Sequence, residues 1–198
     1  MKNIENLPFE LHLTVDAIHN ERETEFATIC QNLHSKAILI HLARGAHQQQ
    51  PMLTKVFYEN GLETVVNKAN LLASELKQLN FNPNRIKIEI PAYCAHLFEN
   101  ELNNVKNYFE WHAKIEYKQV ELLTQICQQH QTHLSKNSLK NDENQRFITL
   151  RHYGNQPDFE QRIANLKAEL TQNTWTIGKE QAEFCLYDSN VDLDKGWL

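Results

Sequence analysis

Apolar and polar residues alternate along two stretches of the chain, residues 9–15 and 109–115. A period of two is typical of a strand that buries one face. We expect the apolar side chains of each stretch to face a core, which leaves a repeated Glu-x-His on the other face. The polar sets on this second face are Glu10, His12 and Thr14 in the first stretch and Glu110, His112 and Lys114 in the second.

Hydrophobic periodicity predicts the same order of elements in both halves of the chain. Residues 62–79 carry apolar side chains at helical spacing, and residues 85–90 alternate strictly before Pro91. The order strand, helix, strand, strand, helix, strand is typical of the ferredoxin-like unit. We expect helices at 21–34, 62–79, 120–131 and 159–170, strands at 9–15, 37–42, 52–58, 85–90, 111–117, 146–153 and 183–187, and a short strand or loop at 133–139.

The fold class predicted by this order is α+β, a tandem duplication of a ferredoxin-like βαββαβ unit with pseudo-twofold symmetry. A repeat of this length indicates a duplicated domain rather than a solenoid. The expected division is residues 1–91 for the first repeat, 92–107 for a connector and 108–198 for the second repeat. We expect the two repeats to pack as one globular body.

Composition narrows the function classes. The formal net charge of -5 argues against a dedicated nucleic-acid binder, so no nucleic-acid partner is expected. The longest mainly apolar run, residues 37–42, is too short to cross a bilayer, and the first residues do not look like a signal peptide. The four cysteines are widely spaced, which favours reduced thiols in a cytoplasmic protein.

The polar faces of the two predicted sheets are the natural place for a site. In a duplicated protein these faces can line a common cleft, to which Glu89 and, from the second unit, Arg151 and Tyr153 also contribute. Solvation of both faces is the alternative, since antiparallel sheets often expose one side.

Metal binding is one function that fits such a cleft. His12, His112 and Glu89 supply imidazole and carboxylate ligands that suit a divalent ion.

The metal hypothesis resembles the arrangement of the vicinal oxygen chelate enzymes, which pair modules with His on a first strand and Glu on a last one. In this chain Cys185 stands where a second Glu is expected. The strand order also differs from that of those enzymes.

Acid/base chemistry on a phosphate ester is the second option. His12 would move a proton, Thr14 would hold an oxygen, and Lys114 with Arg151 would balance phosphate charge. The segment His12-Leu13-Thr14-Val15 resembles one half of the signature of two-histidine phosphoesterases. The other half is sought in 112–115, where Lys114 replaces Ser or Thr, or in 133–136, where His133 and Ser135 match but the position is not repeat-equivalent.

The chain also resembles an uncharacterised family of small bacterial proteins of unknown function. This resemblance implies that the His133 loop and the C-terminal tail belong with the strand pair, and it implies no activity. The residues that carry it are Phe9-Glu10-Leu11-His12, Phe109-Glu110 with His112, His133-Leu134-Ser135 with Asn137, Tyr187-Asp188-Ser189-Asn190, Leu193-Asp194 and Gly196-Trp197.

The leading functional hypothesis is a small-molecule-binding protein or enzyme whose site lies between the halves. His12, His112, Thr14 and Lys114 are its expected catalytic residues. A structural or interaction module, including a homodimer, and a His/Glu metal-binding protein are the alternatives. The expected ligand-binding residues are Glu10, Glu110, His133, Ser135, Arg151 and Tyr153.

Overall fold

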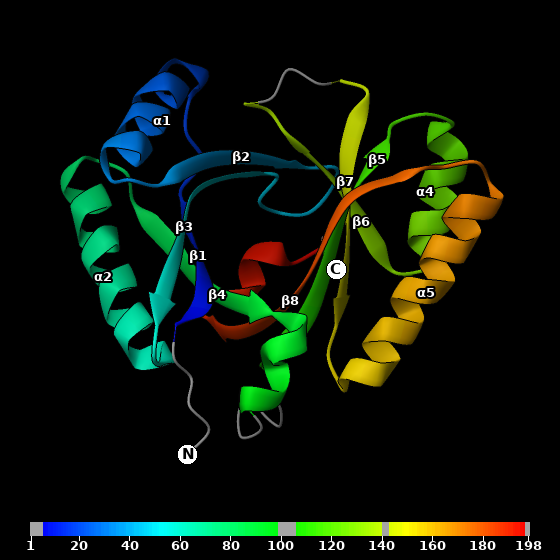
Figure 1. The fold of residues 1–198 in the computed structure, drawn as a ribbon. Helices are drawn as coiled ribbons and strands as arrows, with labels where there is room; N and C mark the ends of the chain where they lie inside the picture. The colour runs from blue at the N-terminus through cyan, green and yellow to red at the C-terminus, as the bar shows by residue number, and fades with distance from the viewer. Residues whose placement is uncertain (1–5, 99–105, 140–142, 197–198) are drawn as a thin grey trace.

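The computed structural model describes residues 6–98, 106–139 and 143–196. Within these residues eight antiparallel strands close into one barrel, in the order β1-β3-β2-β6-β7-β5-β8-β4 (Figure 1). The predicted tandem of open ferredoxin-like sheets is therefore wrong. The elements follow the chain in the expected order, but all the strands belong to one continuous sheet.

The boundaries of all the strands differ from the expected ones, those of β8 most. β3 begins at Gln49 and includes Pro51, which lies opposite Leu39. The N–H of Leu39 donates to the Asn137 side chain, and its C=O accepts from the N–H of Ser138. No hydrogen bond between Leu39 and Pro51 is therefore lost because proline lacks an N–H. The strands are β1 (Leu7–Val15), β2 (Lys36–Leu42), β3 (Gln49–Glu59), β4 (Pro83–Pro91), β5 (Tyr108–Glu116), β6 (Thr132–Asn137), β7 (Gln145–His152) and β8 (Ile177–Asp188).

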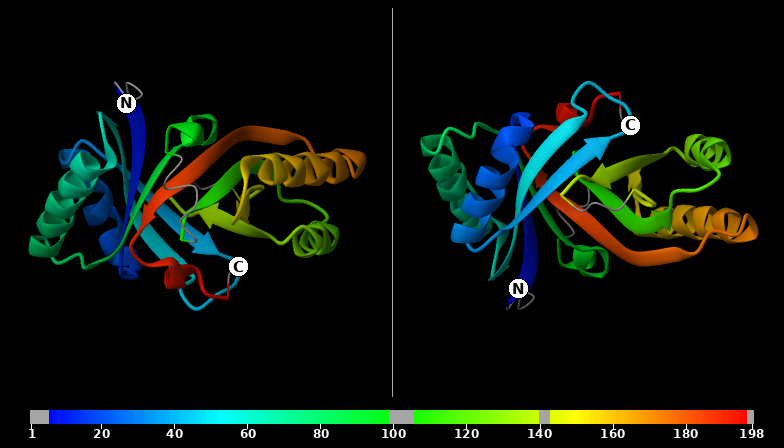
Figure 2. Two further views of the ribbon diagram at one scale, coloured as in Figure 1. Left: turned by 90° about the horizontal axis from the view of Figure 1, so that it is seen from below. Right: turned by 90° about the horizontal axis from the view of Figure 1, so that it is seen from above.

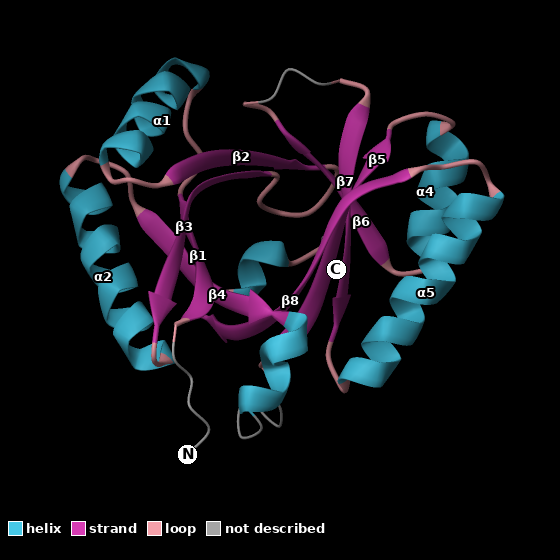
Figure 3. Ribbon diagram, in the orientation of Figure 1, coloured by secondary structure: helices cyan, strands magenta, loops and turns pink. Residues whose placement is uncertain are grey.

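Over the residues that the structure describes, four α-helices pack against the outside of the barrel, in two pairs on opposite sides (Figure 3). α1 and α2 contact strands of the first half, and α4 and α5 contact strands of the second. At the start of α5, Asn155 caps the helix by accepting a hydrogen bond from the N–H of Asp158. The helices are α1 (Glu23–Asn32), α2 (Leu62–Gln78), α4 (Val120–Gln129) and α5 (Gln156–Gln172), and the short 3-10 turns are η1 (Asn20–Arg22), η2 (Ala92–Phe98) and η3 (Val191–Asp194).

The hydrophobic core lies between the barrel wall and the helices. Phe9, Leu11 and Leu13 of β1 are fully buried. On α2, Val65 and Ala69 are buried at a spacing of four residues, which places them on one face of the helix. Because the apolar side chains point outward to the helices, the alternate polar side chains of the strands point into the barrel.

Two seams close the barrel. β2 pairs with β6 through three positions, Ile40–Leu42 against 135–137, and β4 pairs with β8 through a longer register. As edges of separate sheets, β2 and β4 would leave rows of N–H and C=O groups unpaired. Closure pairs them, which is the physical reason why two facing open sheets are not formed.

The last turn, η3, lies across one end of the barrel (Figure 2). It is the red turn beyond the strands in Figure 1, and in both views of Figure 2 it lies on the side away from the N-terminus. Asp194 of η3 is buried and points into the barrel end. Part of the expected connector, residues 99–105, and Trp197 of the tail lie outside the described residues.

Candidate functional site

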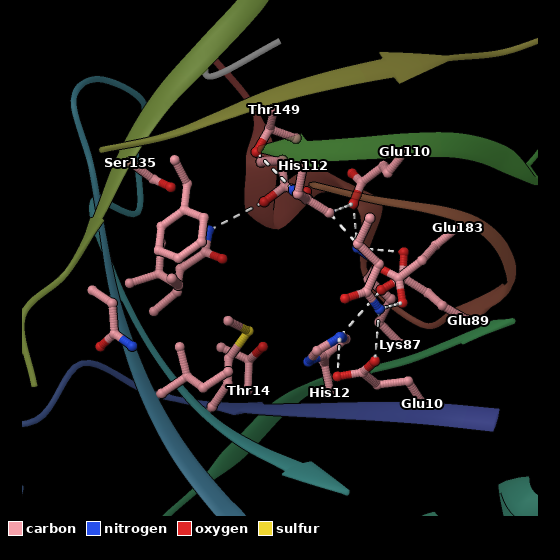
Figure 4. A pocket seen from close by; sticks show the side chains of 18 of the residues that line it. Glu10, His12, Thr14, Lys87, Glu89, Glu110, His112, Ser135, Thr149 and Glu183 are labelled. Carbon is pink, nitrogen blue, oxygen red and sulfur yellow. Dashed lines mark hydrogen bonds and ion pairs between the residues drawn. The ribbon is translucent and has the colours of Figure 1, made fainter. Parts of the chain in front are cut away.

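The barrel encloses a cavity of about 310 Å³ (Figure 4). This volume is at the lower end of the range of small-molecule sites, about 300–1,000 Å³. One wall is polar and is formed by inward residues of β1, β4, β5 and β8. The other wall is largely apolar and carries Ile38, Ile40, Leu42, Met52 and Phe147.

Two histidines occupy matching positions in the polar wall. His12 lies opposite Thr54 in the β1–β3 register, and its Nδ1 is 2.9 Å from the Thr54 hydroxyl. His112 lies opposite Thr149 in the β5–β7 register, with the same distance of 2.9 Å between its Nδ1 and the Thr149 hydroxyl. Each hydroxyl fixes the orientation of its imidazole ring.

The second nitrogen of each ring faces carboxylates. His12 Nε2 is 3.2 Å from Glu89 Oε2 and 3.9 Å from Glu10 Oε1. His112 Nε2 is 3.1 Å from Glu110 Oε2 and 4.0 Å from Glu183 Oε2. A Thr–His–Glu series therefore occurs twice along the polar wall, once around His12 and once around His112.

Lys87 links the two series. Its ammonium lies 2.9 Å from Glu89 Oε1 and 2.5 Å from Glu110 Oε2. Burial opposes the charge of Lys87, but Glu110 and Glu89 raise its pKa above the ordinary value. In the same way, burial opposes ionisation of the two carboxyls, but the neighbouring cations hold the pKa of Glu89 below its usual value and that of Glu110 well below it. The wall thus carries two ionised carboxylates with the ammonium of one lysine between them.

Glu183 is the exception among the buried carboxyls. Burial raises its pKa well above the ordinary value, and the charges of Glu89 and Glu10 add to this effect. The side-chain amide of Gln181 donates to Glu183 Oε1 at 2.8 Å and to Glu10 Oε2 at 3.1 Å. Glu183 is therefore a carboxylic acid that keeps its proton in a cavity where its neighbours have lost theirs.

A second group of charges fills the end of the barrel beneath η3. Asp194 accepts hydrogen bonds from Arg85, from Arg151 and from the amide of Gln50. Arg151 also donates to Glu110 Oε1 at 2.6 Å, which connects this group to the histidine wall. Asp188 accepts hydrogen bonds from the Arg85 guanidinium and from the Tyr108 hydroxyl.

The structure brings most of the sequence-predicted residues into the cavity. Glu10, His12, Thr14, Glu89, Glu110, His112, Lys114, Ser135 and Arg151 all line it. Thr14 is buried, and its hydroxyl has no hydrogen-bond partner among the described residues. His133 and Tyr153 do not line the cavity: His133 contacts Arg44, and Tyr153 is half exposed and packs on Tyr108.

Sequence reasoning missed Lys87, Glu183 and Asp194. The sequence does contain a signal for the first two. Strict alternation puts Lys87 on the same face of its strand as Glu89, and it puts Glu183 on the opposite face from the apolar Phe184. No periodic signal exists for Asp194, because it lies in a short polar tail.

The metal hypothesis finds little support in this geometry. No group of three or more His, Cys, Asp or Glu side chains within residues 6–98, 106–139 and 143–196 is arranged to hold a metal ion. Lys87 lies between Glu89 and Glu110, so an ammonium stands where a cation would need to bind.

The phosphoesterase hypothesis also meets a difficulty. Each His Nε2 faces a carboxylate, and an anionic phosphate beside it would be repelled by Glu89 and Glu110. Ser135 lines the cavity, whereas its motif partner His133 does not.

Comparison with known proteins adds no assignment. No protein-family model matches the chain, and no curated protein gives a significant match. In the part of the chain that the structure describes, no helix has both the length and the apolar character needed to cross a membrane. The resemblances drawn from short motifs remain predictions.

We expect Glu183→Gln to stabilise the protein at neutral pH. Above the unfolded pKa of about 4.3 the unfolded chain loses the Glu183 proton, but the folded protein retains it. This group therefore contributes stability at low pH that is lost as the pH rises through its raised folded pKa. Chemical denaturation at pH 5 and pH 8 measures the effect. The difference in unfolding free energy between variant and wild type should grow by more than about 0.5 kcal/mol in favour of the variant, and an unchanged difference would contradict the assignment.

Proposed function

We propose that the protein is an enzyme that binds a small organic molecule inside the barrel and transfers protons to and from it. The observation that carries the proposal is the arrangement of His12, His112 and Glu183 on one wall of a cavity whose other wall is largely apolar. A cavity with an apolar wall and a few convergent polar groups is the usual form of a small-molecule site.

The three side chains are of two chemical kinds within one cavity. Burial raises the pKa of Glu183 well above its ordinary value, so that it can act as a proton donor, and each imidazole offers a nitrogen within 3.2 Å of a carboxylate oxygen. Carboxyl and imidazole groups held together in a cavity are typical of acid/base sites. The threonine hydroxyls hold the rings in place, as positioning residues, so that a ring can accept a proton without turning.

The walls also define the class of substrate. The side chains of Ile38, Ile40 and Met52 favour an apolar body, and the rest of the lining carries carboxylates and cations together, so neither sign of charge dominates. We therefore propose a compact, uncharged substrate with a polarised group, such as a carbonyl, that loses or gains a proton. We also propose a cytoplasmic location, which the four buried free thiols support.

Deuterium exchange tests this function directly. The protein is incubated in D2O with a panel of small apolar ketones and aldehydes, and incorporation next to the carbonyl is followed by NMR. We expect exchange that falls at least about 100-fold in His12→Gln and in Glu183→Gln, since general acid/base groups contribute about 10²–10⁴ in rate.

His19→Gln is the matched control, because His19 is exposed and lies outside the cavity. It should exchange at the wild-type rate. Exchange that survives in both cavity variants, or no exchange and no binding of any panel member, would show the proposal to be wrong.

A further inference from the structure

A second recess lies outside the barrel cavity, at the end of β7. Its volume is about 500 Å³, and it is bounded by the β2–β3 loop, α4, β6 and α5. Its lining contains three arginines, two histidines and no aspartate or glutamate. The lining residues are Arg44, Gln128, Gln131, His133, Arg151, His152, Tyr153 and Arg162. This is unexpected in a chain whose formal net charge is -5.

Two of the three guanidiniums lack a countercharge among the described residues. Arg151 is balanced, because it donates to Glu110 and Asp194. Arg162 donates to the backbone carbonyls of Arg151 and His130, and neither it nor Arg44 forms an ion pair with a carboxylate of the described residues. Arg162 is partly buried, and burial lowers the pKa of its guanidinium. A partly buried charge without a partner is costly, and an anion would offset that cost.

The histidines of the recess add hydrogen-bonding groups rather than charge. Burial and the guanidiniums of Arg44 and Arg151 lower the pKa of His133 to about 4, so this ring is neutral near pH 7. Its Nδ1 lies 3.2 Å from Arg44 Nη2 and accepts from it, which fixes the direction of an otherwise exposed arginine. The Nε2 of His152 is buried and has no hydrogen-bond partner within the described residues.

We propose that this recess binds the phosphate group of a small phosphorylated molecule. The two uncompensated charges of Arg44 and Arg162 match a phosphate dianion, and guanidinium forks match the geometry of phosphate oxygens. The volume exceeds that of a bare phosphate ion, and Gln128 and Gln131 supply amides for a polar body attached to it. This site is independent of the acid/base function proposed for the barrel cavity.

Calorimetric titration with inorganic phosphate, at low ionic strength in a buffer whose base is uncharged, such as Tris, tests the proposal. We expect saturable binding that weakens at least tenfold in Arg44→Gln and in Arg162→Gln. Arg44 is exposed on a loop, so its replacement should leave the fold intact. Arg44→Gln therefore tests the site even if Arg162→Gln disturbs the fold by removing the contacts of Arg162. Arg162→Lys keeps the charge without the fork and should bind with intermediate affinity.

Lys77→Gln is the control, because it removes one exposed positive charge from α2, on the opposite side of the barrel. Its phosphate affinity should equal that of the wild type. If phosphate affinity fell equally in Lys77→Gln and Arg44→Gln, the binding would be due to general charge attraction, and the proposed site would be wrong. Acetate binding as tightly as phosphate would overturn the phosphate assignment.

Discussion

Asp194→Ala is expected to lower the free energy of unfolding by about 3–5 kcal/mol, the usual cost of removing one partner from a buried ion pair. Asp194 is buried between the guanidiniums of Arg85 and Arg151. Burial opposes its ionisation, but the two arginines hold its pKa below the ordinary value. Without the carboxylate, Arg85 still faces Asp188 and Arg151 still faces Glu110, but the anion between the two guanidiniums is lost. Urea denaturation of both proteins at pH 7 measures the loss.

Asp192→Ala provides the matched control within the same turn. Asp192 is exposed, so its removal should change the unfolding free energy by less than about 0.5 kcal/mol. Similar stabilities for the two variants would mean that η3 does not hold the barrel end together. Because the stability supplied by Asp194 is present above its unfolded pKa and is lost as the pH falls through its lowered folded pKa, the gap between the variants should narrow in acid.

Lys87→Met is the second change with a large expected effect. Methionine keeps the volume of the side chain but removes the charge that separates Glu89 and Glu110. Two ionised carboxylates buried together are strongly unfavourable, so we expect a loss of about 3–5 kcal/mol at pH 8. The pKa of at least one of them must then rise, and protonation at low pH should restore part of the stability.

The measurement is the unfolding free energy of Lys87→Met at pH 5 and pH 8, compared with Lys77→Met. Lys77 is exposed on α2 and makes no contribution to the cavity. A penalty that does not depend on pH would indicate that Lys87 acts through packing alone. A penalty that grows with pH supports the charge bridge.

Alternation in the sequence was sufficient to place four of the cavity-facing residues. Glu10, His12, Glu110 and His112 share a parity with one another in their strands, and in the structure all four line the cavity. The helical stripe of residues 62–79 likewise predicted α2, which spans Leu62–Gln78. Both results follow because a side chain's direction depends on local backbone geometry alone.

Closure of the barrel could not be predicted in the same way. The β2–β6 and β4–β8 seams are made by backbone groups, which every residue possesses, so the side-chain pattern is the same for open and closed sheets. The role of Asp194 depends on a tail that returns to the barrel from far along the chain. Its contact with Arg85 spans 109 positions, and no local pattern encodes such a distance.

Closure also bears on how the chain avoids self-association. A sheet with free edges offers a template on which a second copy can add a strand. In the described residues each strand has a neighbour on both sides, so the folded protein presents no such template. Between β2 and β6 only three pairs of residues keep the two strand edges covered. Opening of that seam would expose β2 and β6 as free edges, on which a second copy could add a strand.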